Sequence, residues 1–412
     1  MKAAIIALFS LCLALLTAVP SFALDSLNVR QLGFYDTPEY AYRVAVAGNY
    51  AYVADGYSGL RVVNITNPAA PTEVGFYDTP GEGLGVAVAG SYAYVADGTD
   101  YLRVVNITNP SSPVEAGWCC TPGYAYNVVV AGNYAYVADY DRGLRVVNIT
   151  NPAAPSEVGF YDPPPVYTYA WDVVVSGNYA YVADYCSGLR VVNITNPAAP
   201  TEVGSYDTPG YACGVTVSGN YAYVADYSGG LRVVNITNPS SPVSAGFYDT
   251  PGYAFGVAVS GNYAYVADYG SGLRVVNITN PAMPSEVGFY DTPGSAWGVA
   301  VDGCRAYVAD FYYLGIYDIS YFAPCPVPTA PDCLIIQYLP ETQDFLLSWT
   351  PVLEDTAGLP IDVDYYVVLR GNSADVMDSL GVPVPPDTMA FIDSTAFGAG
   401  ANFFYKVKAV KN

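Results

Sequence analysis

The sequence predicts an all-β protein built from seven copies of one four-stranded unit, the arrangement of a β-propeller. The tetrapeptide Tyr-Val-Ala-Asp occurs seven times, at a spacing of 42 residues with one interval of 45. A strict period of this length is typical of repeat architectures, and four short strands per period are typical of propeller blades. Hydrophobic residues make up 52% of the chain and charged residues only 13%, a composition that favours strands over helices.

The first copy shows how each unit is assembled. Residues 43–47 and 50–55 are strand-like and flank Gly48-Asn49, a pair suited to a tight hairpin turn. A third strand is expected over 60–66 and a fourth over 72–77. The first three strands carry apolar residues on both faces, so each sheet is expected to pack between two neighbours.

The two ends of the repeat array are complementary. An isolated strand of the fourth type is expected over residues 29–35, before the first complete copy. The last copy has a third strand over 315–320 but no fourth strand after it. The N-terminal strand is therefore predicted to complete the seventh blade and to close a propeller over residues 24–322, which would protect the sheet edges.

The motif itself is similar to a known family. Tyr-Val-Ala-Asp is followed by Gly-Leu-Arg-Val-Val-Asn-Ile-Thr-Asn-Pro and by a second Pro three residues on. This pattern resembles the LVIVD repeat of bacterial and archaeal surface proteins over residues 29–320. The resemblance implies a propeller exported to the cell surface. It implies no reaction, and it offers no catalytic residues to carry over.

The N-terminus has the pattern of a secretory signal peptide. Lys2 precedes an apolar run, and small residues at Ser21 and Ala23 suit a cleavage site after Ala23. Residues 1–23 are therefore expected to be removed, and the mature protein to be secreted or displayed at the cell surface. No later apolar stretch approaches 18 residues, so no transmembrane span is predicted.

The C-terminal segment departs from the repeat. Residues 323–333 are Pro-rich and are predicted to form a linker. Strand-like runs follow over 344–351, 363–370 and 401–410. With Trp349, Tyr365 or Tyr366, and Tyr405, residues 334–412 resemble a fibronectin type III domain. That resemblance implies a small β-sandwich. Because the usual last strand would follow Asn412, the domain is expected to be either shortened or completed by something else.

Composition excludes several functions. The chain has no His, which removes every mechanism and metal site built on imidazole. Its net charge is −22 and it has no Lys between Lys2 and Lys406, which argues against nucleic-acid partners. The sequence predicts no cofactor and no metal centre.

Two sets of repeated or reactive residues have structural interpretations. The Asp that ends each Tyr-Val-Ala-Asp is expected to accept backbone hydrogen bonds or to pair with the Arg six residues later, although a ring of metal ligands is the alternative. An export compartment permits disulfides. Cys186 and Cys213 fall on one face, and Cys325 and Cys333 flank the linker. The seven cysteines of the mature chain are an odd number, which leaves their connectivity open.

The strongest functional signal lies where the repeats differ. Positions beside the start of each first strand are aromatic or charged in some blades and small in others. Aromatic side chains there suit protein or sugar contacts because they bury a large rigid area and can still hydrogen bond. The candidate ligand-binding residues are Tyr42, Arg43, Tyr126, Trp171, Asp172, Phe255 and Trp297. Packing of the blade tops is the alternative role for these side chains.

The sequence therefore predicts a non-catalytic binding or adhesion protein that recognises a protein or glycan at the cell surface. A structural extracellular component without a dedicated ligand is one alternative. A polysaccharide hydrolase or lyase is a weaker one, resting on the blade-specific carboxylates Glu82, Asp100 and Asp172.

Overall fold

The computed structural model describes residues 26–163 and 168–323, with the backbone alone at Asp100, and the backbone of six strands between residues 334 and 410. All regular secondary structure in these residues is β-strand. Among them, no helix is long and apolar enough to span a bilayer. The predicted signal peptide and the predicted linker from residue 324 onward lie outside the described residues.

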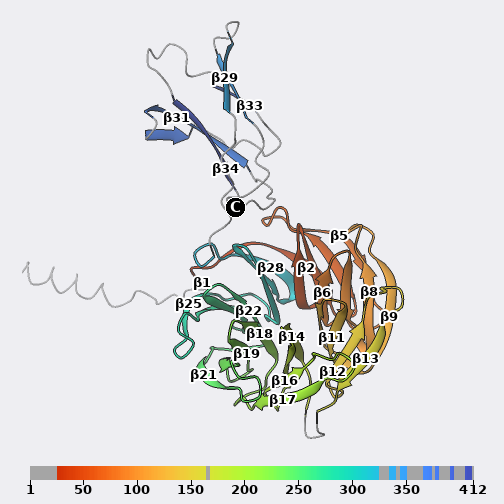
Figure 1. Ribbon diagram of the computed structural model, residues 1–412. Coiled ribbons are helices and arrows are strands. Elements are labelled where there is room, and N and C mark those ends of the chain that lie inside the picture. The colour runs from red at the N-terminus through yellow and green to blue at the C-terminus, as the bar shows by residue number, and fades with distance from the viewer. Residues whose placement is uncertain are drawn as a thin grey trace, which may run out of the picture. The chain divides into compact units, whose positions relative to one another are not determined.

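The repeat region forms seven antiparallel units of four strands, which we number 1 to 7 along the chain and which fan out around a common centre (Figure 1). Units 2 to 6 are separate sheets, and units 7 and 1 share strand β2. Unit 2 consists of β6 (Gly85–Ala89), β7 (Tyr92–Ala96), β8 (Gly98–Asn106) and β9 (Val114–Ala125). Unit 3 consists of β10 (Asn127–Ala131), β11 (Tyr134–Ala138), β12 (Leu144–Asn148) and β13 (Ser156–Tyr161). Unit 4 consists of β14 (Asp172–Ser176), β15 (Tyr179–Ala183), β16 (Leu189–Asn193) and β17 (Thr201–Tyr206).

The other units have the same strand order. Unit 5 consists of β18 (Gly214–Ser218), β19 (Tyr221–Ala225), β20 (Leu231–Asn235) and β21 (Val243–Tyr248). Unit 6 consists of β22 (Gly256–Ser260), β23 (Tyr263–Ala267), β24 (Leu273–Asn277) and β25 (Ser285–Tyr290). The short strand β1 (Ser26–Leu27) pairs with β25. The shared sheet runs in the order β26 (Gly298–Asp302), β27 (Arg305–Ala309), β28 (Phe311–Asp318), β2 (Arg30–Ala47), β3 (Tyr50–Asp55), β4 (Leu60–Asn64) and β5 (Thr72–Tyr77).

Strand β2 serves two units at once. Its first part pairs with β28, with Phe34 opposite Gly315, and its last part pairs with β3, with Val46 opposite Ala51. The predicted pairing of the N-terminal strand with the last third-type strand is thus observed. The strand expected over residues 29–35 does not end there but continues through Asp36-Thr37-Pro38, because Pro and the residue before it both tolerate an extended backbone. The register with β28 shifts after Asp36.

The core lies between successive units, as two-sided apolar strands require. Tyr136 and Leu144 of unit 3 pack with Val173 and Val182 of unit 4 in one buried cluster. The first and last units meet in the same way: Val44 and Val53 share a cluster with Leu314 and Ile316. Burial of such side chains contributes about 1.5–3 kcal/mol each to stability.

The repeated Asp ties the loop before each unit to the turn after its second strand. Asp97 Oδ2 accepts hydrogen bonds from the backbone N–H of Gly81 at 3.2 Å and from Nε of Arg103 at 2.9 Å. Unit 7 has Ile316 in place of the Arg, and there Asp310 accepts from the Thr292 hydroxyl at 2.7 Å and the Gly294 N–H at 3.0 Å. These contacts support the structural interpretation, and they do not require the Arg.

The chain divides into two compact units at about Asp318, with residues 302–305 grouped with the second. The described strands of the C-terminal part form two antiparallel sheets of three strands. One contains β29 (Leu334–Leu339), β30 (Asp344–Trp349) and β33 (Ala390–Asp393), and the other contains β32 (Val376–Ser379), β31 (Tyr365–Ser373) and β34 (Phe404–Val410). The expected strands over 344–351, 363–370 and 401–410 overlap β30, β31 and β34.

Candidate ligand pocket

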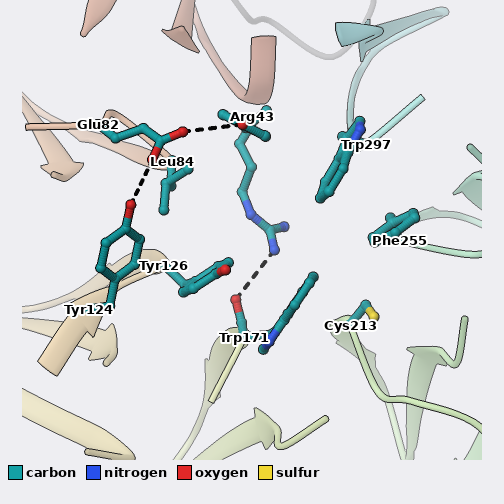
Figure 2. A pocket seen from close by; sticks show the side chains of 10 residues that line it. Arg43, Glu82, Leu84, Tyr124, Tyr126, Trp171, Cys213, Phe255 and Trp297 are labelled. Atoms are coloured by element: carbon teal, nitrogen blue, oxygen red, sulfur yellow. Dashed lines mark hydrogen bonds between the residues drawn. The ribbon is translucent and has the colours of Figure 1, made fainter. Parts of the chain in front are cut away.

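A pocket of about 190 Å³ lies where the first strands of the units begin (Figure 2). Six of the seven predicted binding residues line it, and the seventh, Asp172, lies buried beside Arg43 without lining the pocket. The complete lining consists of Tyr42, Arg43, Glu82, Leu84, Tyr124, Tyr126, Trp171, Cys213, Phe255 and Trp297.

Glycine keeps the centre of the molecule open for this pocket. The first residue of the inner strand is Gly85, Gly214, Gly256 or Gly298 in four units. A Cβ at Gly298 would lie 2.6 Å from the carbonyl oxygen of Tyr42, and a Cβ at Gly256 would lie 2.7 Å from that of Trp297. The neighbouring backbone thus leaves no room for a side chain at these positions. Units 1, 3 and 4 carry a larger residue at this position. That residue is an arginine in unit 1 alone, where it is Arg43.

Aromatic rings form the wall of the pocket, and we call them the inner layer: Tyr42, Tyr126, Trp171, Phe255 and Trp297. Phe255 stacks on Trp297 with ring centroids 4.3 Å apart, and Tyr126 stacks on Trp171 at 5.0 Å. The Tyr42 ring meets Trp297 edge-on at 5.4 Å. Such pairs contribute about 0.5–1.5 kcal/mol beyond their buried area, so the rings hold one another in place.

Among the residues that the structure describes, Arg43 is the only cation that lines the pocket. Its guanidinium points into the space between Tyr126, Trp171 and Trp297 (Figure 2), and its side chain is 20% exposed. Its two polar contacts are both long: Nη1 lies 3.5 Å from Asp172 Oδ2, and Nη2 lies 3.5 Å from the Trp171 carbonyl oxygen.

Asp172 already has its hydrogen-bond partners. Its Oδ1 accepts from Asn127 Nδ2 and from the Val173 N–H, and its Oδ2 accepts from the Val215 N–H at 2.9 Å. Three donors from units 3, 4 and 5 therefore satisfy this buried carboxylate. The two backbone donors, the N–H groups of Val173 and Val215, hold the Asp172 carboxylate beside the pocket, so it does not form part of the wall.

Glu82 lies on the opposite wall and joins two Tyr side chains from different units. Its oxygens accept from the Tyr42 hydroxyl at 3.2 Å and from the Tyr124 hydroxyl at 2.6 Å. Burial, together with the Glu82 charge, raises the pKa of both phenols. Glu82 was expected only as a candidate catalytic group, and Tyr124 was not among the predicted binding residues. The signal for Tyr124 was its position two residues before Tyr126, at the end of β9.

A second group of aromatics, the outer layer, surrounds the inner one at the turns after the second strands. Its members have left-handed backbone conformations, with positive φ at Tyr140, Tyr185, Tyr227, Tyr269 and Phe311. Bulky residues rarely adopt this conformation, which costs roughly 1–2 kcal/mol for a residue with a Cβ. Units 1 and 2 have Gly56 and Gly98 at the same position, also with positive φ. Tyr140, Tyr185 and Tyr227 of the outer layer stack on a ring from the loop that follows their unit; Tyr227 and Tyr253, for example, have centroids 4.3 Å apart.

The cysteine prediction needs correction. Cys186 and Cys213, which were one possible disulfide pair, are both free thiols in the structure. Cys213 is buried in the pocket lining while Cys186 is exposed on its turn, and burial raises the pKa of Cys213. Cys304 belongs to neither of the two possible pairs, and it is disulfide-bonded. Cys325 and Cys333 lie outside the described residues.

The family follows from the repeats. The LVIVD repeat model matches more than half of the chain, in seven copies over residues 38–79, 80–121, 122–163, 168–208, 209–250, 251–292 and 293–323. The chain belongs to the LVIVD repeat family. The seventh LVIVD repeat is shorter than the others, and β2 supplies the fourth strand that it lacks.

Solved structures that resemble this LVIVD repeat chain include two β-propeller domains. The β-propeller domain of Cps50 (Swd1) from Myceliophteria thermophila matches with 11% identity and a TM-score of 0.58, over 70% of this chain and 99% of that one. The WD40 β-propeller domain of Doa1 matches with 12% identity and a TM-score of 0.59, over 71% and 97%. BamB from Moraxella catarrhalis matches with 14% identity and a TM-score of 0.50, over 70% and 97%. At these identities the likeness shows the fold alone.

A comparison with curated proteins finds no match for the LVIVD repeat chain.

Proposed function

We propose that the protein is an exported, non-catalytic binding protein, secreted or displayed at the cell surface, that recognises a protein or glycan through its aromatic pocket. The observation that carries this proposal is the pocket itself. The five aromatic side chains of the inner layer come from five different units and stand at positions where the repeats differ. Pockets that are mostly apolar with a few polar groups are typical of ligand sites.

The outer layer adds independent support. Five units place an aromatic residue in a backbone conformation that Gly would adopt more easily, and two units do have Gly there. Backbone strain of this kind concentrates at functional sites. Stacking offsets part of the cost, and the remaining strain is consistent with a face that is used for contacts.

Three features of the whole chain belong to the same proposal. The pairing of β2 with β28 and the buried cluster shared by the first and last units support a closed seven-bladed propeller. Two three-stranded antiparallel sheets support a fibronectin type III-like sandwich in the C-terminal part. The N-terminal signal peptide pattern supports export.

The experiment is a pull-down from envelope extract with the mature protein, run beside a glycan array. Replacement of both Trp171 and Trp297 by Ala is expected to abolish ligand retention and to lower the melting temperature by only a few degrees, since the two rings face a pocket. The matched control replaces Phe76 and Phe160 by Ala. These side chains are 50% and 52% exposed on the fourth strands, away from the pocket, and retention should persist.

Two other results would each favour an alternative. No saturable binding in either assay would favour the structural component without a dedicated ligand. Turnover of a polysaccharide that is lost in Glu82→Gln would favour the hydrolase or lyase, because Glu82 is a carboxylate in the pocket wall.

A further inference from the structure

We propose that the pocket takes a carboxylate-bearing sugar ring, a uronic acid residue of an acidic polysaccharide. The carboxylate would bind the Arg43 guanidinium, and the ring would lie against the inner layer. This inference rests on the proposed binding function and names the class of ligand for the same pocket.

The first argument is that Arg43 is poorly engaged by the protein. Both of its polar contacts are 3.5 Å long. The structural arginine Arg103, by contrast, has Nε 2.9 Å from Asp97 and Nη1 3.3 Å from Glu115. A guanidinium has five N–H donors in a planar fork that matches a carboxylate. Most of the donors of Arg43 therefore have no protein acceptor within normal hydrogen-bond distance.

The second argument is that the acceptors near Arg43 are already occupied. Asp172 accepts hydrogen bonds from Asn127, Val173 and Val215, and Glu82 accepts from Tyr42 and Tyr124. The unused polar capacity of the pocket is therefore on the donor side, and it is cationic. A ligand that supplies a planar anionic acceptor would form a closer charge-assisted pair with Arg43 than the 3.5 Å contact that Asp172 provides.

The third argument concerns the body of the ligand. The wall contains the Trp171, Phe255 and Trp297 rings, and the pocket has about 190 Å³ of space. A slender Asp or Glu side chain of a peptide would leave much of that wall uncovered, whereas a sugar ring would cover it. The net charge of −22 opposes an acidic polymer at long range, but screening limits this repulsion to about 8 Å at physiological ionic strength.

The test is calorimetric titration of the mature full chain with galacturonate and glucuronate oligosaccharides and with the same oligosaccharides after reduction of their carboxylates to alcohols. The acidic forms are expected to bind at least about tenfold more tightly. Arg43→Gly should remove this preference, and four other units already have Gly at that position, so the fold should tolerate it. Arg43→Lys, which keeps the charge without the fork, should retain part of the preference.

The matched control is Arg142→Gln, an exposed arginine whose ion-pair partner is Asp141 at 3.8 Å, and it should leave the preference intact. Equal binding of acidic and reduced oligosaccharides would overturn the carboxylate inference and leave the binding function standing. A preference that survives Arg43→Gly with an unchanged melting temperature would also overturn it. Arg43-dependent binding of acidic peptides without sugar binding would overturn the choice of a sugar. No binding of any of these probes would overturn the uronic acid inference, whereas the proposed function itself would fail only if the pull-down and the glycan array also showed no saturable binding.

Discussion

At the scale of single residues, backbone strain distinguishes the aromatic residues of the outer layer. Tyr227 has a φ of 49°, and its ring stacks on Tyr253 with an interplanar angle of 4°. The strain costs roughly 1–2 kcal/mol, and the stack offsets about 0.5–1.5 kcal/mol of it. The stability of the fold therefore does not by itself explain an aromatic residue at this position.

Tyr227→Gly is accordingly expected to change the free energy of unfolding by less than about 1 kcal/mol while it weakens retention of the ligand. Urea unfolding and the pull-down measure the two effects. Gly59→Ala provides the contrast, because its φ is 71° and a Cβ would lie 2.4 Å from the Thr79 nitrogen. That variant should lose well over about 1 kcal/mol. A comparable loss for Tyr227→Gly would show that the ring has a packing role.

At the scale of the element, the buried Asp of each unit fastens a loop to a turn. Asp268 accepts from the Thr250 hydroxyl at 2.5 Å and from the Gly252 N–H at 2.7 Å. This loop leads into the inner strand that starts beside Phe255. The Asp thus helps to position the pocket wall without lining the pocket.

Asp268→Ala is expected to lower the free energy of unfolding by about 3 kcal/mol, because it leaves buried donors without an acceptor. Chemical denaturation checks this value. Asp141→Ala is the control: its side chain is 53% exposed, and its replacement should change stability by less than about 0.5 kcal/mol. Similar small losses for both variants would contradict the fastening role.

At the scale of the whole molecule, the same carboxylates predict how stability depends on pH. Burial raises the pKa of Asp55, Asp139, Asp184 and Asp268 to about 6. Between about pH 4 and pH 6 the folded chain therefore binds more protons than the unfolded chain. Stability must fall as the pH rises through this window.

The melting temperature is accordingly expected to be higher at pH 5 than at pH 7. Asp268→Asn should reduce this difference, because the amide does not titrate. Scanning calorimetry at the two pH values measures both, and a higher melting temperature at pH 7 in the parent protein would refute the prediction.

The proposed closure of the propeller gives a second prediction at this scale. Removal of residues 26–36 would leave β28 as an unpaired edge strand. Unpaired edges promote association, so the truncated protein should unfold at a lower temperature and form oligomers. Light scattering coupled to gel filtration detects these species. A monomer of unchanged stability would show that closure does not depend on this strand.

Much of this architecture could be predicted from local pattern. The period of 42 residues, the hairpin at Gly48-Asn49 and the unmatched strands at the two ends indicated the units and the pairing of β2 with β28. The aromatic positions of the pocket also followed, because identical units place equivalent residues around one centre. A repeated sequence is informative in this way since each copy has the same local environment.

Contacts between units depended on the tertiary structure. The bonds of Glu82 to Tyr42 and Tyr124 join residues 40 and 42 positions apart, and Asp172 is satisfied by donors from the neighbouring units. Cys186, which is exposed on its turn, and Cys213, which is buried in the pocket lining, are free thiols. Periodicity determined which positions face the centre. Side-chain direction, burial and the partners from adjacent units decided what each position does there, and left Arg43 with donors that the protein does not use.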